Sequence, residues 1–81
     1  MSEELDKILE YLQEMKEDST IPKNVKLKID DVTNSLKTKE ELSIRVNRAL
    51  NYLDEIADDS NLQPYARTQI WNIVSLLEKL C

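Results

Sequence analysis

The sequence predicts an all-α protein, an up-and-down four-helix bundle made of two duplicated helical hairpins. Residues 5–36 match residues 46–77 at a constant offset of 41 positions. Apolar residues recur at helical spacing in four stretches, and a chain with no glycine and two prolines has the composition of a compact helical protein. Units of about forty residues that contain two helices bury their apolar faces only by packing on a neighbour. We therefore expect both copies to form one domain over residues 1–81.

Matching positions of the repeat are identical or conservatively exchanged. The identical pairs include Leu9/Leu50, Tyr11/Tyr52, Leu12/Leu53, Asp18/Asp59, Ser19/Ser60 and Ile29/Ile70. A solenoid is another arrangement for such units, but two repeats without capping repeats are too few to form one. The repeat therefore favours a bundle in which the hairpins 3–37 and 40–78 superpose.

The first hairpin is expected to contain helices over about residues 3–17 and 22–37. Ser2 can cap the first helix, residues 18–20 interrupt the helical pattern, and Pro22 suits the first turn of the second helix. The apolar positions of the first helix are Leu5, Ile8, Leu9, Leu12 and Met15, and those of the second are Val25, Ile29, Val32 and Leu36.

The second hairpin is expected to contain helices over about residues 39–58 and 63–80. Thr38 and Glu41 have the spacing of a capping box, which predicts that the third helix begins directly after Thr38. Because the chain lacks glycine, left-handed turn positions are expected to fall to Asn or Asp. The inward positions are Leu42, Val46, Ala49, Leu50, Leu53 and Ile56 in the third helix and Ala66, Ile70, Ile73 and Leu77 in the fourth.

The net charge of −5 is unevenly distributed, since residues 22–48 carry seven basic and four acidic side chains. An acidic chain repels phosphate backbones, so nucleic-acid binding is not expected overall. The alternative is an RNA-associated or ribonucleoprotein accessory factor that binds through the basic segment 22–48. Its local basic patch consists of Lys23, Lys26 and Lys28. No apolar run approaches the roughly 20 residues that span a bilayer. With one cysteine, Cys81, the chain is expected to be cytoplasmic, with no membrane partner.

Catalytic and metal-ligating patterns are absent from the sequence. The chain has no histidine, and adjacent carboxylates such as Asp30 and Asp31 point about 100° apart on a helix, so they do not converge on a metal. Residues 58–61 crowd oxygen ligands together but lack the glycine and the acidic twelfth position of a calcium loop. We expect a non-enzyme without catalytic residues, cofactor, metal or small-molecule substrate.

The fourth helix differs most from its duplicate. Large apolar residues replace polar ones in the pairs Asp30/Trp71, Thr33/Val74, Ser35/Leu76 and Lys39/Leu80. Arg67 precedes Trp71 by four residues, where a guanidinium can stack on the indole. One interpretation is that this helix lies deeper in an asymmetric bundle, and the other is an interface with a protein partner or a second copy. The expected interface residues are Tyr65, Arg67, Trp71, Val74, Leu76 and Leu80.

The segment 64–78, together with residues 18–22 of the first unit, resembles a family of small archaeal proteins known as uncharacterised protein family 0147. The resemblance covers essentially the whole chain, and Arg67-Thr68-Gln69-Ile70-Trp71 is its most specific part. It implies a compact all-helical protein from an archaeon, of unknown function and without assigned site residues. The expected function is a non-catalytic structural or protein-interaction module that acts through the fourth helix.

Overall fold

The computed structural model of the protein describes residues 3–80, and within this range it is all-α. Four helices follow one another along the chain: α1 (Glu3–Glu17), α2 (Lys23–Leu36), α3 (Leu42–Ala57) and α4 (Pro64–Glu78). The predicted fold class of four packed helices is confirmed. Ser2, the expected cap of the first helix, and Cys81 lie outside the described residues.

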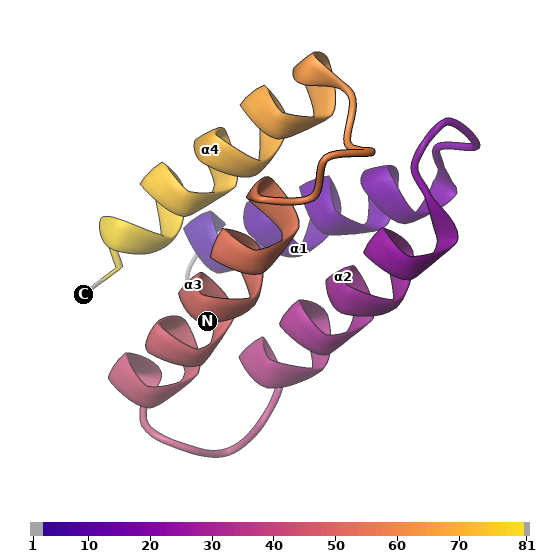
Figure 1. The fold of residues 1–81 in the computed structure, drawn as a ribbon. Helices are drawn as coiled ribbons and strands as arrows, with labels where there is room; N and C mark the ends of the chain where they lie inside the picture. Colours follow the sequence, from indigo (N-terminus) through magenta and orange to yellow (C-terminus); the bar gives the residue numbers. More distant parts are fainter. Residues whose placement is uncertain (1–2, 81) are drawn as a thin grey trace.

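The helices form a closed ring around one core. α2 packs most extensively against α3, α3 packs against α4, and α1 completes the ring by packing against both α2 and α4. Consecutive helices run in opposite overall directions, so the α1–α2 and α3–α4 loops lie at the same end of the molecule (Figure 1). This arrangement brings the starts of α2 and α4 close to both loops.

Buried positions recur at the offset of 41. Nine core residues of the first half have a buried counterpart in the second half: Leu5/Val46, Ile8/Ala49, Leu12/Leu53, Met15/Ile56, Ile21/Leu62, Val25/Ala66, Ile29/Ile70, Val32/Ile73 and Leu36/Leu77. Burying a large aliphatic side chain contributes about 1.5–3 kcal/mol, so these pairs supply most of the stabilisation of the fold. Ala57 is buried as well, although its counterpart Lys16 is half-buried.

The two equivalent loops close with the same hydrogen bonds. Asp18 Oδ1 accepts from the backbone N–H of Thr20 at 2.9 Å, and Asp59 Oδ1 accepts from that of Asn61 at 2.8 Å. These side chains bend the chain while every described residue keeps a negative φ. The expectation that Asn or Asp would occupy left-handed turn positions is therefore wrong, because side-chain acceptors make such positions unnecessary.

The beginnings of α2 and α3 also differ from expectation. α3 begins at Leu42 with Glu41 as its N-cap residue, so the predicted capping box at Thr38 is wrong. The Thr38 hydroxyl instead donates to the Ser35 carbonyl at 3.3 Å, at the end of α2. Pro22 precedes α2 rather than lying in its first turn, whereas Pro64 does occupy the first turn of α4.

Candidate protein-interaction site on α4

Hydrogen bonds at the loop end of the bundle join each hairpin to the other. The Tyr65 hydroxyl, at the start of α4, donates to the Asp18 carboxylate in the α1–α2 loop. The Asn24 side-chain amide, at the start of α2, donates to Asp59 Oδ2 in the α3–α4 loop at 2.9 Å. Asn24 and Tyr65 are equivalent positions of the repeat, and so are Asp18 and Asp59. Each hairpin therefore donates one hydrogen bond to a loop carboxylate of the other.

Both loop carboxylates are held in their charged form by these donors. The Tyr65 hydroxyl, with the Thr20 hydroxyl and N–H, lowers the pKa of Asp18 to about 2. The Asn61 N–H and the Asn24 amide lower the pKa of Asp59. A carboxylate that accepts several hydrogen bonds gains little from a further ligand, which indicates a structural role for both residues.

Two hollows adjoin the flank of α4 that faces α1. One, of about 260 Å³, lies where the end of α1 meets the start of α4, and Asp18, Tyr65 and Met15 contribute to its lining. The other, of about 490 Å³, is bordered by Tyr11 and Leu76. The Asp18 carboxylate of the first hollow already accepts three hydrogen bonds, so it does not present an unpaired charge to a ligand.

Arg67 stabilises the end of α3. Its guanidinium donates to the carbonyl oxygens of Ala57 and Asp59, both at 3.0 Å, and more weakly to that of Leu62 at 3.4 Å. The last carbonyls of a helix have no partner within the helix, so a cation that donates to them stabilises the helix end. The guanidinium that the sequence places one turn before the Trp71 indole thus directs its N–H groups to the end of α3 and to the loop that follows it.

Trp71 occupies a position at which the first hairpin has an ion pair. In that hairpin Lys16 of α1 and Asp30 of α2 form a salt bridge between the two helices. The equivalent positions of the second hairpin are Ala57 and Trp71. Ala57 is buried, but 48% of the Trp71 surface is exposed. Where the first hairpin has a charged link, the second hairpin thus has a small buried residue and an exposed indole.

The six expected interface residues occupy two flanks of α4. Arg67, Trp71 and Val74 lie on the flank toward α3, whereas Tyr65, Leu76 and Leu80 lie on the flank toward α1. Val74, Leu76 and Leu80 are partly buried against the core. Tyr65 is 52% exposed but bonded to Asp18. Trp71 is therefore the member of the set that presents a large apolar surface without a polar link to another helix.

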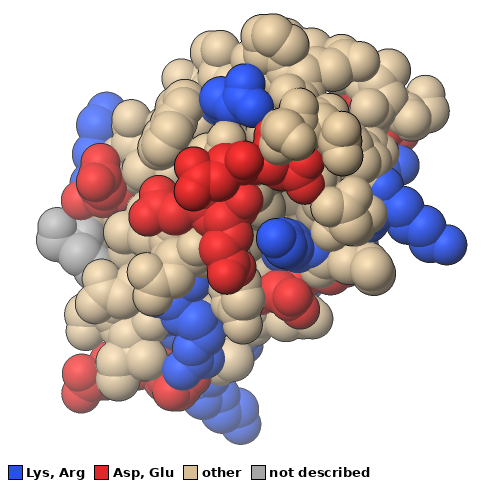
Figure 2. Space-filling model, viewed as in Figure 1, with Lys and Arg blue, Asp and Glu red and all other residues tan. Residues whose placement is uncertain are grey.

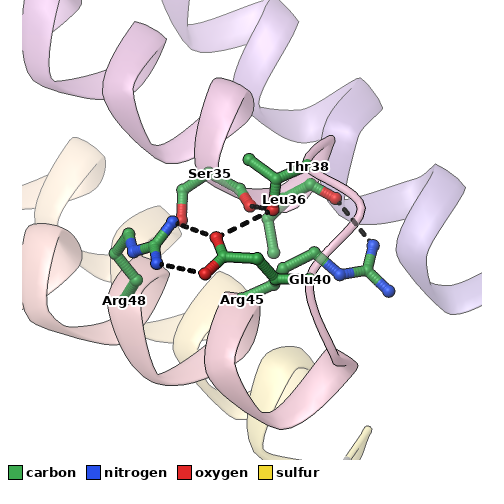
Figure 3. A network of polar contacts seen from close by, with 6 residues as sticks. All are labelled: Ser35, Leu36, Thr38, Glu40, Arg45 and Arg48. Atoms are coloured by element: carbon green, nitrogen blue, oxygen red, sulfur yellow. Dashed lines mark hydrogen bonds and ion pairs between the residues drawn. The ribbon is translucent and has the colours of Figure 1, made fainter.

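The α2–α3 junction uses two of the basic residues of segment 22–48. Arg48 donates through two nitrogens to Glu40, at 2.6 and 2.9 Å, and Arg45 donates to the Leu36 carbonyl at 3.0 Å (Figure 3). The Arg48 hydrogen bonds lower the pKa of Glu40, and Glu40 in turn raises the pKa of Arg48. Arg45 therefore joins α3 to the end of α2, and Arg48 joins α3 to the α2–α3 loop, so both cations already have acceptors.

The expected basic patch is not brought together on one face. Helical geometry places Lys26 and Lys28 on opposite flanks of α2, with Lys23 pointing outward between them. The charge of Lys26 acts on Asp18, and that of Lys28 acts on Asp59. On the face in Figure 2, Lys and Arg side chains lie scattered around a central band of Asp and Glu.

Metal-binding and membrane-spanning features are lacking in residues 3–80. No three His, Cys, Asp or Glu side chains of this range are close enough to hold a metal ion together. Within the same range no helix combines the length and the hydropathy that crossing a bilayer requires.

Comparison of the sequence copies alone did not find the bonds Tyr65–Asp18 and Asn24–Asp59. A polar residue such as Tyr65 gives no sign in the sequence of which distant loop it will contact. The exchange of Lys16 for Ala57 was visible at the offset of 41 and accompanies the change of Asp30 to Trp71. Considered together, the pairs Lys16/Ala57 and Asp30/Trp71 indicate that the second hairpin lacks the salt bridge that joins the two helices of the first.

Comparison with known proteins identifies relatives over nearly the whole chain. Residues 1–80 match the model of an uncharacterised protein family, UPF0147. A UPF0147 protein of Archaeoglobus fulgidus is 36% identical over 76 residues, which cover 94% of this chain and 87% of the relative. UPF0147 protein MJ1419 of Methanocaldococcus jannaschii is 40% identical over 70 residues, covering 85% and 75%.

Two crystal structures have the same fold. A protein from the uncharacterized family UPF0147 from Thermoplasma acidophilum superposes with a TM-score of 0.91 at 34% identity, covering 96% of this chain and 93% of that one. The unknown function protein MMP1188 superposes with a TM-score of 0.87 at 42% identity, covering 93% and 86%. The names of these relatives assign no activity.

Proposed function

We propose that this chain, which belongs to the uncharacterised protein family UPF0147, is a non-catalytic protein-interaction module that acts through α4. The observation that carries the proposal is the exposure of Trp71, 48% of whose surface is open. Tryptophan is among the residues that most often anchor protein interfaces, because it buries a large area in one contact. At the position equivalent to Trp71 the first hairpin has Asp30, which forms a salt bridge with Lys16.

The surroundings of Trp71 support this role. Val74 lies one turn further along the same flank and is partly buried, so it continues the apolar surface toward the core. Arg67, one turn before Trp71 on the same flank, is joined to the α3 end by hydrogen bonds, which fix this part of α4 against α3. A rigid aromatic group loses little conformational entropy on binding.

The experiment is capture of partners from an extract of an archaeon that contains a member of the family. The bait proteins are wild type, Trp71→Ala and Leu27→Ala, because Leu27 is the most exposed large apolar side chain outside α4, at 60%. We expect a protein retained by wild type and by Leu27→Ala but lost with Trp71→Ala. Equal retention by all three baits, or no retained protein, would remove the proposal.

The alternative role as an RNA-associated factor has less support. Of the seven cations of segment 22–48, Lys26 and Lys28 act on the two loop aspartates, and Arg45 and Arg48 bond at the α2–α3 junction. Phosphate-driven binding weakens steeply with salt, so a residual RNA affinity would be lost between low and physiological salt. Lys26→Glu with Lys28→Glu should abolish any such retention on immobilised RNA, and unchanged retention would exclude this segment as the site.

We also propose that the up-and-down bundle arose by duplication of one hairpin. The equivalence of nine buried pairs, of both loop turns and of the reciprocal bonds at the loop end supports this origin. Duplication explains the functional asymmetry, since one copy can keep the interhelical ion pair while the other changes it to a binding surface.

A further inference from the structure

The surface around Trp71 differs in charge from the matching surface of the first hairpin. We call Asp54, Asp58, Trp71 and Glu78 the Trp71 face. Asp54 precedes Ala57 by one helical turn, Asp58 follows it directly, and Glu78 lies two turns beyond Trp71 on the same side of α4. All four side chains are exposed. The face therefore carries one indole and three carboxylates on the exposed sides of α3 and α4.

The corresponding positions in the first hairpin are balanced in charge. They hold Gln13, Glu17, Asp30 and Lys37, and Lys16 stands where the second hairpin has Ala57. Two cations thus accompany two anions, and Lys16 and Asp30 neutralise each other in a salt bridge. The second hairpin has lost both cations, gained Asp54 and Glu78, and gained the indole.

Within residues 3–80 the salt bridges are Lys16–Asp30 and Arg48–Glu40, and neither involves a carboxylate of the Trp71 face. Arg67, the neighbouring cation on α4, is half-buried and directs its guanidinium to the carbonyls of Ala57 and Asp59. Figure 2 shows a central band of acidic side chains on one face of the molecule, and Asp54 lies in the last turn of α3 with Asp58 directly after that helix. An exposed aromatic ring beside uncompensated carboxylates suits a cationic group, which the ring face and the carboxylates attract together.

We propose that the Trp71 face binds a basic segment of a partner protein, with an arginine or lysine side chain over the indole. This inference rests on the proposed function and adds the chemistry of the partner. Charge disfavours a second copy as the occupant, because a twofold contact through this face would bring six carboxylates together in a chain of net charge −5. A basic segment instead neutralises the face while it covers the ring.

The probe is a short synthetic amphipathic peptide of leucine and arginine, with the same peptide carrying glutamate in place of arginine as its control. Binding to wild type is followed by the emission of Trp71, the sole tryptophan of the chain, and by calorimetry for variants without it. Asp54→Gln with Glu78→Lys gives these positions the residues of the first hairpin. Ala57→Lys with Trp71→Asp likewise introduces the lysine and the aspartate that form the Lys16–Asp30 salt bridge in the first hairpin.

We expect the arginine peptide to bind wild type and shift the Trp71 emission, and the glutamate peptide to leave it unchanged. Asp54→Gln with Glu78→Lys should weaken binding about tenfold or more, and Ala57→Lys with Trp71→Asp should abolish it while circular dichroism shows unchanged helix content. Equal binding of both peptides, equal affinity for the charge variant, or no binding of the arginine peptide would overturn the inference.

Failure of this inference and failure of the proposed function give different results. If Trp71 dependence persists in the extract capture while the peptide results are negative, the module has a partner of other chemistry. If both experiments are negative, the interaction role itself is excluded.

Discussion

The Tyr65 hydroxyl of α4 donates to the Asp18 carboxylate of the α1–α2 loop, and the equivalent residue pair makes the same link in the opposite sense. In that second link Asn24 of α2 donates to Asp59 of the α3–α4 loop at 2.9 Å. The same hydrogen bond is made at equivalent positions by an amide donor in one hairpin and a phenol donor in the other, which indicates that its geometry belongs to the packing of the hairpins.

Removing the Tyr65 hydroxyl should raise the pKa of Asp18. In Tyr65→Phe the largest contribution to the lowered value of about 2 is absent, so the pKa should move toward its ordinary value of 3.8. Carbon-detected NMR titration of the side-chain carboxyl measures this directly. Asp59, whose donors are Asn61 and Asn24, is the internal control and should titrate as in wild type.

The stability contributed by Asp18 should disappear in acid. Because folding lowers its pKa from 3.8 to about 2, the stabilisation is complete above about pH 5 and is lost progressively as the pH falls through 2. The melting temperatures of wild type and Asp18→Asn should therefore differ near neutral pH and converge as the pH falls from about 5 to 2. A difference that stays constant across this window would contradict the assignment.

Truncating Arg67 should destabilise the protein by about 1–3 kcal/mol, since partly buried carbonyls at the end of α3 lose their donor. Urea denaturation of Arg67→Ala measures the change. Lys26→Ala is the matched control, because Lys26 is the equivalent residue of the first hairpin and acts on Asp18 by charge alone. Equal effects in both variants would indicate loss of charge instead of loss of the carbonyl bonds.

Equivalent core positions should be of similar energetic importance. Leu12 and Leu53 are both fully buried, and replacing either by alanine should cost about 2–5 kcal/mol of unfolding free energy. Leu27→Ala, on the solvent side of α2, should change stability by no more than about 0.5 kcal/mol. A large effect at only one of the leucines would mean that the two hairpins contribute unequally to the core.

Trp71→Ala should cost about 1–2 kcal/mol of stability, less than the 3–5 kcal/mol typical of a core tryptophan, because half of the side chain is already in water. Thermal and urea unfolding of the isolated chain measure this cost separately from binding. A loss in the core range would show that the indole is mainly structural, and partner capture would then have to be repeated with Ala57→Lys and Trp71→Asp combined.

The sequence by itself determined the four helices, their approximate bounds and nearly all of the core. Helical periodicity is a local property, so positions such as Leu12 and Ile70 could be assigned to the interior without knowledge of their neighbours. The family resemblance could also be recognised from the sequence, and the match over residues 1–80 confirms it.

Only the tertiary structure decided how the flanks of the helices are used. That Arg67 donates to the Ala57 carbonyl and that Tyr65 bonds to Asp18 depends on the rotation of each helix against its neighbours. The predicted box at Thr38 was wrong for a similar reason, since its hydroxyl donates to the end of α2. A polar side chain can form hydrogen bonds with several alternative partners. When those partners lie on different helices, only the packing of the helices determines which partner is within hydrogen-bonding distance.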